Sequence, residues 1–141
     1  MELFNSDIFC FMGRIFLATL LGSIIGLERE YKGHEAGIRT FGIIALGSCI
    51  FGLLSLHISH GDPGRIAAQI VTGIGFLGGG IIIKDGGTIR GLTTATMVWC
   101  TSAIGLAVSF EFYMVSILTT LLALILLIIP HYNPKYRKKE K

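Results

Sequence analysis

Residues 8–27 read IFCFMGRIFLATLLGSIIGL, a run of 20 residues in which Arg14 is the only charged side chain. About 17–25 helical residues cross a hydrocarbon core of about 30 Å, so this run is long enough to span a membrane. Acidic residues, Glu2 and Asp7, precede the run, and no small-residue cleavage site follows it. We therefore interpret it as a retained membrane helix and not as a signal peptide.

Further apolar runs follow at 38–58, 66–83, 92–108 and 112–129. The chain of 141 residues is 52% hydrophobic and 15% charged, whereas a soluble domain carries about 25% charged residues. Lipid offers no partner for backbone N–H and C=O groups, and the alternation of a membrane barrel is missing, so the runs should be helices. We predict an all-α, multi-pass membrane domain of about five transmembrane helices over 1–130, a basic tail at 131–141, and no soluble enzyme domain. The short runs 66–83 and 92–108 are also compatible with tilted or re-entrant segments.

Lysine and arginine are distributed unevenly among the polar breaks between these runs. Ten of the 12 lie in the first break with Arg39, in the third break and in the tail, against Arg65 alone in the second break. This bias predicts an outside N-terminus and a cytoplasmic C-terminus. The basic tail is expected to contact anionic lipid and not nucleic acid, because no basic face accompanies it.

Glycines recur at helical spacing in several runs. Residues 73–78 match the dinucleotide pattern G-x-G-x-x-G, but they lie inside an apolar run, and the acidic residue expected about 20 positions further on is missing, so we reject a nucleotide site. The spacing instead predicts close helix packing, within the chain or in a homodimer. An alternative is that residues 78–80 break the helix and expose its ends to an ion. The small residues in this pattern are the pairs Gly22 and Gly26, Gly75 and Gly79, Gly73 and Gly80, and Ala103 and Ala107.

Polar residues at membrane depth are costly and therefore candidates for function. Arg14 could pair with Asp7, Asp62 or Glu111, or extend to the interface. Gln69 could donate a hydrogen bond between helices. A mixed charged cluster, expected to be mainly a structural ion-pair network, comprises Glu28, Arg29, Glu30, Glu35, Arg39, Lys84, Asp85 and Arg90.

Histidine and cysteine give weaker signals. His57, His60 and Asp62 could ligate a divalent metal by residue type, but such an exposed set usually binds nothing. The three cysteines form no C-x-x-C pair and are expected to be small apolar residues. We therefore assign neither a metal nor a cofactor.

Ordered motifs in the chain resemble the MgtC/SapB family of bacterial inner-membrane proteins. They are GLERE at 26–30, AGIRT at 36–40, PGRIAAQIVTGIGFLG at 63–78 and RGLTTA at 90–95, followed by WC at 99–100. The candidate functional or packing positions from these motifs and the polar residues are Arg14, Glu28, Arg29, Glu30, Arg39, Arg65, Gln69, Gly73, Gly75, Gly78, Gly79, Arg90, Thr93, Thr94 and Trp99.

The resemblance implies a role in adaptation to low magnesium and membrane-energy homeostasis and, in pathogens, in virulence and survival inside macrophages. It also implies action through other membrane proteins, including ATP synthase or a P-type ATPase. The chain has neither the Asp-Lys-Thr-Gly phosphorylation loop of such a pump nor a nucleotide site, so we expect no enzyme activity. The alternative is a small oligomeric channel or transporter for divalent cations. Longer members carry a soluble domain after the last span, and only 131–141 follow Pro130 here, which predicts a short form without that domain.

Overall fold

The computed structural model describes the backbone of residues 2–58, 62 and 64–129. Five helices and one two-stranded hairpin occur in these ranges, so the prediction of an all-α domain is confirmed apart from the hairpin. The basic tail lies outside the described residues. In chain order the elements are α1 (Glu2–Tyr31), α2 (Ile38–Ile58), α3 (Gly64–Ile81), β1 (Ile83–Asp85), β2 (Thr88–Arg90), α4 (Leu92–Ser109) and α5 (Tyr113–Ile128).

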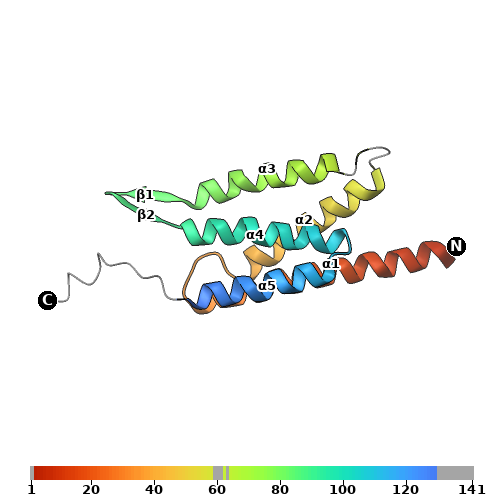
Figure 1. Cartoon of the computed structure of the whole chain (residues 1–141), viewed down its shortest axis with the longest axis horizontal. Coiled ribbons are helices and arrows are strands. Elements are labelled where there is room, and N and C mark those ends of the chain that lie inside the picture. Colours follow the sequence, from red (N-terminus) through yellow and green to blue (C-terminus); the bar gives the residue numbers. More distant parts are fainter. Residues whose placement is uncertain (1, 59–61, 63, 130–141) are drawn as a thin grey trace.

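The bundle has two distinct ends (Figure 1). The α1–α2 connection, the hairpin and the end of α5 lie at one end, which we call the hairpin end. The end of α2, the start of α3 and the α4–α5 turn lie at the other, which we call the opposite end. This arrangement places the first and third polar breaks together, as the charge distribution predicts. The orientation of the bundle across a membrane stays a prediction.

Three helices are long and apolar enough to span a membrane, over Ile8–Tyr31, Ile38–His57 and Leu92–Ser109. Helix α5 is apolar but has only 16 residues. Helix α3 has 18 residues but also carries Arg65, Gln69 and several glycines, and it is not among these three. The chain is therefore a helical membrane protein, and three of the five predicted spans have the length and hydropathy to cross a membrane.

Helix α1 continues past the apolar run into the charged residues that follow it. The predicted end at residue 27 is therefore too early, since the helix ends at Tyr31. Gly33 terminates the helix, because its φ of +75° is a left-handed conformation that suits a glycine. The Gly33 N–H donates to the Glu30 carbonyl and the His34 N–H to the Arg29 carbonyl, both at 3.0 Å. These are the two hydrogen bonds of a Schellman motif.

Glycine allows α1 and α2 to approach each other closely. A Cβ atom at Gly22 would lie 2.5 Å from the Phe41 carbonyl oxygen, and one at Gly26 would lie 2.6 Å from the Gly37 carbonyl oxygen. The packing predicted from the Gly22/Gly26 spacing is therefore confirmed. Between α2 and α4, the Ser48 and Ser102 hydroxyls form a buried hydrogen bond of 2.8 Å, the kind of polar contact that holds membrane helices together.

Helix α3 packs loosely, and the structure supports neither a close contact of Gly75 and Gly79 within the chain nor a break at residues 78–80. Among its described side chains only Ile74 and Gly78 are buried. A Cβ atom at Gly75 or Gly79 would meet no atom within 4 Å, so these glycines do not pack against other helices of the chain. The helix also continues unbroken through residues 78–80 and ends at Ile81. The spacing of Gly75 and Gly79 leaves a homodimer contact as a prediction.

A β-hairpin replaces the polar break predicted between the third and fourth helices. Its strands pair Ile83 with Arg90 and Asp85 with Thr88. Gly86 and Gly87 form the turn with φ of +51° and +88°. Two successive positive φ values give a two-residue turn whose twist matches that of the strands. The third helix therefore ends two residues before the predicted 83.

Candidate functional site

A charged cluster at the hairpin end joins three helices. Arg29 is only 4% exposed, and its Nη2 donates to the Thr94 hydroxyl at 3.3 Å. Its Nη1 lies 3.9 Å from a carboxylate oxygen of Glu28, whose other oxygen lies 2.6 Å from the Lys32 Nζ. Lys32 also donates to the Leu127 carbonyl at the end of α5, at 2.5 Å. The cluster thus ties the end of α1 to the start of α4 and the end of α5.

The predicted network of eight charged residues is smaller than expected. Glu28 and Arg29 belong to it, together with Lys32, which was not a candidate. Glu30 instead caps α2, because its Oε2 accepts a hydrogen bond of 3.0 Å from the Ile38 N–H. Five other members are exposed and make no ion pair with any residue in the described ranges: Glu35, Arg39, Lys84, Asp85 and Arg90.

The Arg29 guanidinium is incompletely paired. Its Nε is buried and has no hydrogen-bond partner among the described residues. Thr94 lies in the first turn of α4, where the N-cap residue is Gly91, which offers no side-chain cap. The start of α4 therefore combines a buried cation, a hydroxyl and unpaired backbone N–H groups.

The opposite end holds the second cluster. Arg14 pairs with the Glu111 carboxylate and donates to the Ser109 carbonyl at 3.2 Å, while its guanidinium lies 5.8 Å from the centre of the Phe11 ring. Of the three acids considered from the sequence, Glu111 is therefore the partner. The Asp62 carboxylate accepts from the Gly64 N–H at 2.9 Å, at the start of α3, and the Asp7 side chain lies outside the described residues.

The suggested histidine metal site gains no support. The His57 ring packs edge-on against Phe11 with centroids 4.8 Å apart, and its Nδ1 lies 2.7 Å from the Leu53 carbonyl oxygen. His60 lies outside the described residues. Within the part of the chain that the structure describes, no three metal-ligating side chains come together. Cys10, Cys49 and Cys100 are free thiols.

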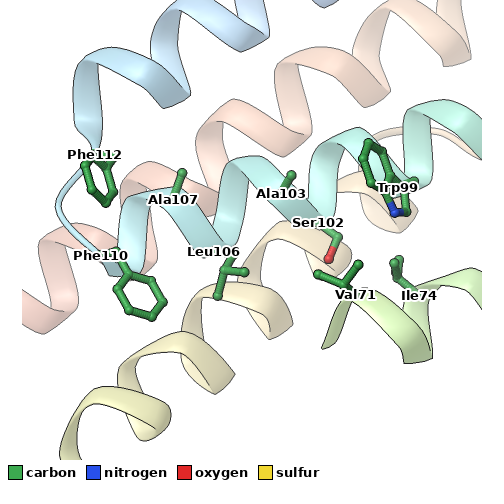
Figure 2. A pocket seen from close by; sticks show the side chains of 9 residues that line it. All are labelled: Val71, Ile74, Trp99, Ser102, Ala103, Leu106, Ala107, Phe110 and Phe112. Carbon is green, nitrogen blue, oxygen red and sulfur yellow. The ribbon is translucent and has the colours of Figure 1, made fainter. Parts of the chain in front are cut away.

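Two apolar grooves flank α3. Figure 2 shows the groove of about 300 Å³ between α3 and α4, with Val71 and Ile74 on one side and Ser102 and Leu106 on the other. Trp99, which is 55% exposed, lies at one end of it. The second groove, about 430 Å³, lies between α2 and α3, and its lining includes Gln69, Gly73 and Ser48. Gln69 is therefore exposed in a groove and makes no hydrogen bond to another described helix.

The other candidate positions are scattered. Gly78 is buried against Ala95 of α4, with 3.6 Å between a built Cβ atom and the Ala95 carbonyl oxygen. Thr93 is exposed in the first turn of α4, and Arg65 is exposed in the first turn of α3. The candidates therefore divide between the two charged ends and the surface of α3.

The charged motifs at 26–30 and 90–95 thus meet across space, since Arg29 contacts Thr94. The chain matches the MgtC family over residues 15–133, which covers both motifs. The chain belongs to the MgtC family. This family is not known as a family of enzymes.

Curated relatives come from several bacteria. The Protein MgtC of Salmonella typhimurium strain LT2 is 47% identical over 97 residues, which cover 69% of this chain and 42% of that protein. The Protein MgtC of Brucella abortus is 50% identical over 62% of this chain and 37% of that protein. An uncharacterized protein of Haemophilus influenzae is 38% identical over 87% of this chain and 56% of that protein. The chain thus spans about two-fifths of the length of these MgtC relatives, and no solved structure matches it.

Sequence reasoning missed two parts of the site. Lys32 was not a candidate, although its i,i+4 spacing from Glu28 is the usual spacing of a helical ion pair. The contact between Arg29 and Thr94 joins residues 65 positions apart, and only the folded chain brings them together.

Proposed function

We propose that this chain is a non-enzymatic, multi-pass protein of the bacterial inner membrane that acts by modulating other membrane proteins during adaptation to low magnesium. Membership of the MgtC family supports the proposal. In a pathogen the same role would contribute to virulence and to survival inside macrophages. ATP synthase and a P-type ATPase are the partners that we propose to test first.

The observation that carries the proposal is the uncovered surface of α3. Gly73, Gly75 and Gly79 have open space where a side chain would extend. The two apolar grooves lie on either side of this helix. Small residues let a second helix approach a backbone closely in lipid, and the van der Waals packing that results is one of the forces that hold membrane helices together. The surface therefore suits a helix of a partner protein or of a second copy.

A divalent-cation channel is the competing function, and the structure removes one argument for it. Transporters often bind ions at the ends of broken helices, whereas α3 runs unbroken from Gly64 to Ile81. Gln69 remains the polar side chain that a pathway along α3 would use. Magnesium flux into liposomes from the purified protein, lost on Gln69→Leu, would favour the channel over the modulator.

Growth of a deletion strain across a magnesium series tests the proposal. The unaltered gene should restore growth at low magnesium, whereas Gly79→Leu should insert normally and fail, because the leucine blocks the close approach of a partner helix. Gly13→Leu is the matched control, since Gly13 also has open space around it but lies on α1. Failure of the unaltered gene to restore growth would refute the role. Full restoration by Gly79→Leu would refute the contact surface.

A further inference from the structure

The positive charge of Arg29 is not balanced within its own cluster. Glu28 is the carboxylate beside it, at 3.9 Å, and that group is closer to Lys32, at 2.6 Å. The Glu30 carboxylate accepts the Ile38 N–H at the start of α2 and does not pair with Arg29. The cluster of Glu28, Arg29 and Lys32 therefore carries one excess positive charge around a guanidinium that is only 4% exposed. A buried cation is costly unless it is paired and hydrogen-bonded, so this site favours an anion.

The first turn of α4 adds donors at the same place. An α-helix leaves its first N–H groups without intrahelical partners, and its N-terminus carries a partial positive charge. Gly91 precedes this turn with φ of +80° and supplies no capping side chain. The Arg29 Nη2 contacts the Thr94 hydroxyl, so the guanidinium points at this turn. Leu92 and Thr93 are exposed, which leaves the turn reachable from solvent.

We propose that Arg29, the Thr94 hydroxyl and the first turn of α4 bind a phosphate-type oxyanion. Guanidinium groups pair with phosphate oxygens through charge-assisted hydrogen bonds, and helix N-termini bind phosphate through their N–H groups. Arg29 of α1 and the first turn of α4 are already in contact through Thr94, so the two helices need little rearrangement to bind an anion together. The unpartnered Arg29 Nε is the observation that separates this turn from an ordinary helix start.

Two sources can supply the oxyanion. Arg29 lies two residues after Leu27, the last residue of the apolar run of α1, and this position suits the phosphate of a lipid headgroup. Free inorganic phosphate has the same recognition chemistry. Both sources predict the same dependence on Arg29, and they differ in which probe binds.

Phosphorus NMR on the full chain in a maltoside detergent, which contains no phosphate, tests the proposal. Inorganic phosphate is titrated in one arm and a short-chain phosphatidylglycerol in the other, at constant ionic strength. Saturable binding of at least one probe is expected. Arg29→Gln should weaken it at least about tenfold, because a charge-assisted contact is lost. Arg39→Gln is the matched control and should leave binding unchanged, since Arg39 is exposed and makes no ion pair with a described residue.

Thr94→Val keeps the shape of the residue and removes the hydroxyl, so it tests the site even where Arg29→Gln fails to fold. It should weaken binding about fivefold while the helical circular dichroism stays unchanged. Binding of phosphate alone identifies a free ion, and binding of the lipid alone identifies a headgroup. Binding of neither probe by the unaltered chain overturns the proposal, and so does equal binding by the folded Arg29→Gln or Thr94→Val variants. None of these outcomes depends on the magnesium role.

Discussion

Arg14 of α1 and Glu111 of the α4–α5 turn form an ion pair between residues 97 positions apart. Glu111 adopts a positive φ of +67°, which is rare for a residue other than glycine, and its carboxylate thereby reaches the first helix. Arg14 in addition donates to the Ser109 carbonyl at the end of α4. At the opposite end of the bundle, this pair links α1 to the α4–α5 turn. The cluster around Arg29 links α1 to α4 and α5 in the same way at the hairpin end.

Removing the charge of Glu111 should lower the stability of the bundle modestly, because the ion pair with Arg14 is lost. Glu111→Gln is expected to lower the free energy of unfolding by about 1 kcal/mol or less, because the carboxylate is mostly exposed and such pairs contribute little. Unfolding in mixed micelles with increasing sodium dodecyl sulfate measures the change. Asp62→Asn is the control and should have no effect, since the Asp62 side chain accepts the Gly64 N–H and the asparagine amide oxygen can keep that bond. A larger loss for Asp62→Asn than for Glu111→Gln would contradict the assignment.

The contact between α1 and α2 should not tolerate a side chain at Gly22. A Cβ atom there would lie 2.5 Å from the Phe41 carbonyl oxygen and 2.7 Å from the Ala45 Cβ, so backbone must move. Gly22→Ala is expected to cost about 1–3 kcal/mol, the usual cost of overpacking. Gly13→Ala on the same helix has open space and should be neutral or slightly stabilising. Equal stability of the two variants would show that the helices do not pack as described.

The start of α2 should depend on the Glu30 carboxylate. Glu30→Ala is expected to lower stability by about 0.5–2 kcal/mol, because the Ile38 N–H loses its acceptor. Glu30→Gln keeps an acceptor oxygen and should recover much of the loss. Glu35→Ala, at an exposed neighbouring position, serves as the comparison in the same unfolding assay. The capping role is refuted if Glu30→Ala and Glu35→Ala are equally harmless.

Stability should fall in mild acid through His34. Partial burial lowers the pKa of His34 below 6.5, and the positive charge of Arg29 lowers it further. The folded chain then binds a proton less readily than the unfolded chain, so stability is greatest above pH 6.5 and decreases as the pH falls through 6.5 towards the lowered pKa. Histidine NMR titration should place the His34 midpoint below 6.5, the ordinary value. His34→Gln should reduce the pH dependence of unfolding, and a midpoint above 6.5 would contradict the prediction.

Hydrophobic run length predicts the helices well but not their ends. The bounds 38–58 agree with α2, because polar residues flank the apolar run in the sequence on both sides. At α1 the charged residues after 27 suggested an end, whereas the helix continues because Glu28 and Lys32 pair along it. The hairpin was missed although the Gly86–Gly87 pair is a common two-residue turn.

Glycine spacing alone cannot show which surface a helix buries. Gly22 and Gly26 on α1 and Gly75 and Gly79 on α3 have the same spacing, yet only the first pair contacts another helix of the chain. The two pairs of glycines differ because of tertiary packing. Helix α2 packs against the glycines of α1, whereas apolar grooves lie on either side of α3. The partner of Arg14 was undetermined for the same reason, because three acids satisfied the charge requirement and only the fold selects Glu111.

Cysteine accessibility in sphaeroplasts measures whether the chain is a membrane bundle with its hairpin end on the cytoplasmic side. After replacement of the three native cysteines, a membrane-impermeant thiol reagent is applied to His34→Cys, Thr88→Cys and Arg65→Cys. Arg65→Cys should be labelled in intact sphaeroplasts, and His34→Cys and Thr88→Cys only after lysis. Labelling of all three in intact sphaeroplasts, or recovery of the chain as a free monomer in the aqueous fraction, would contradict this prediction.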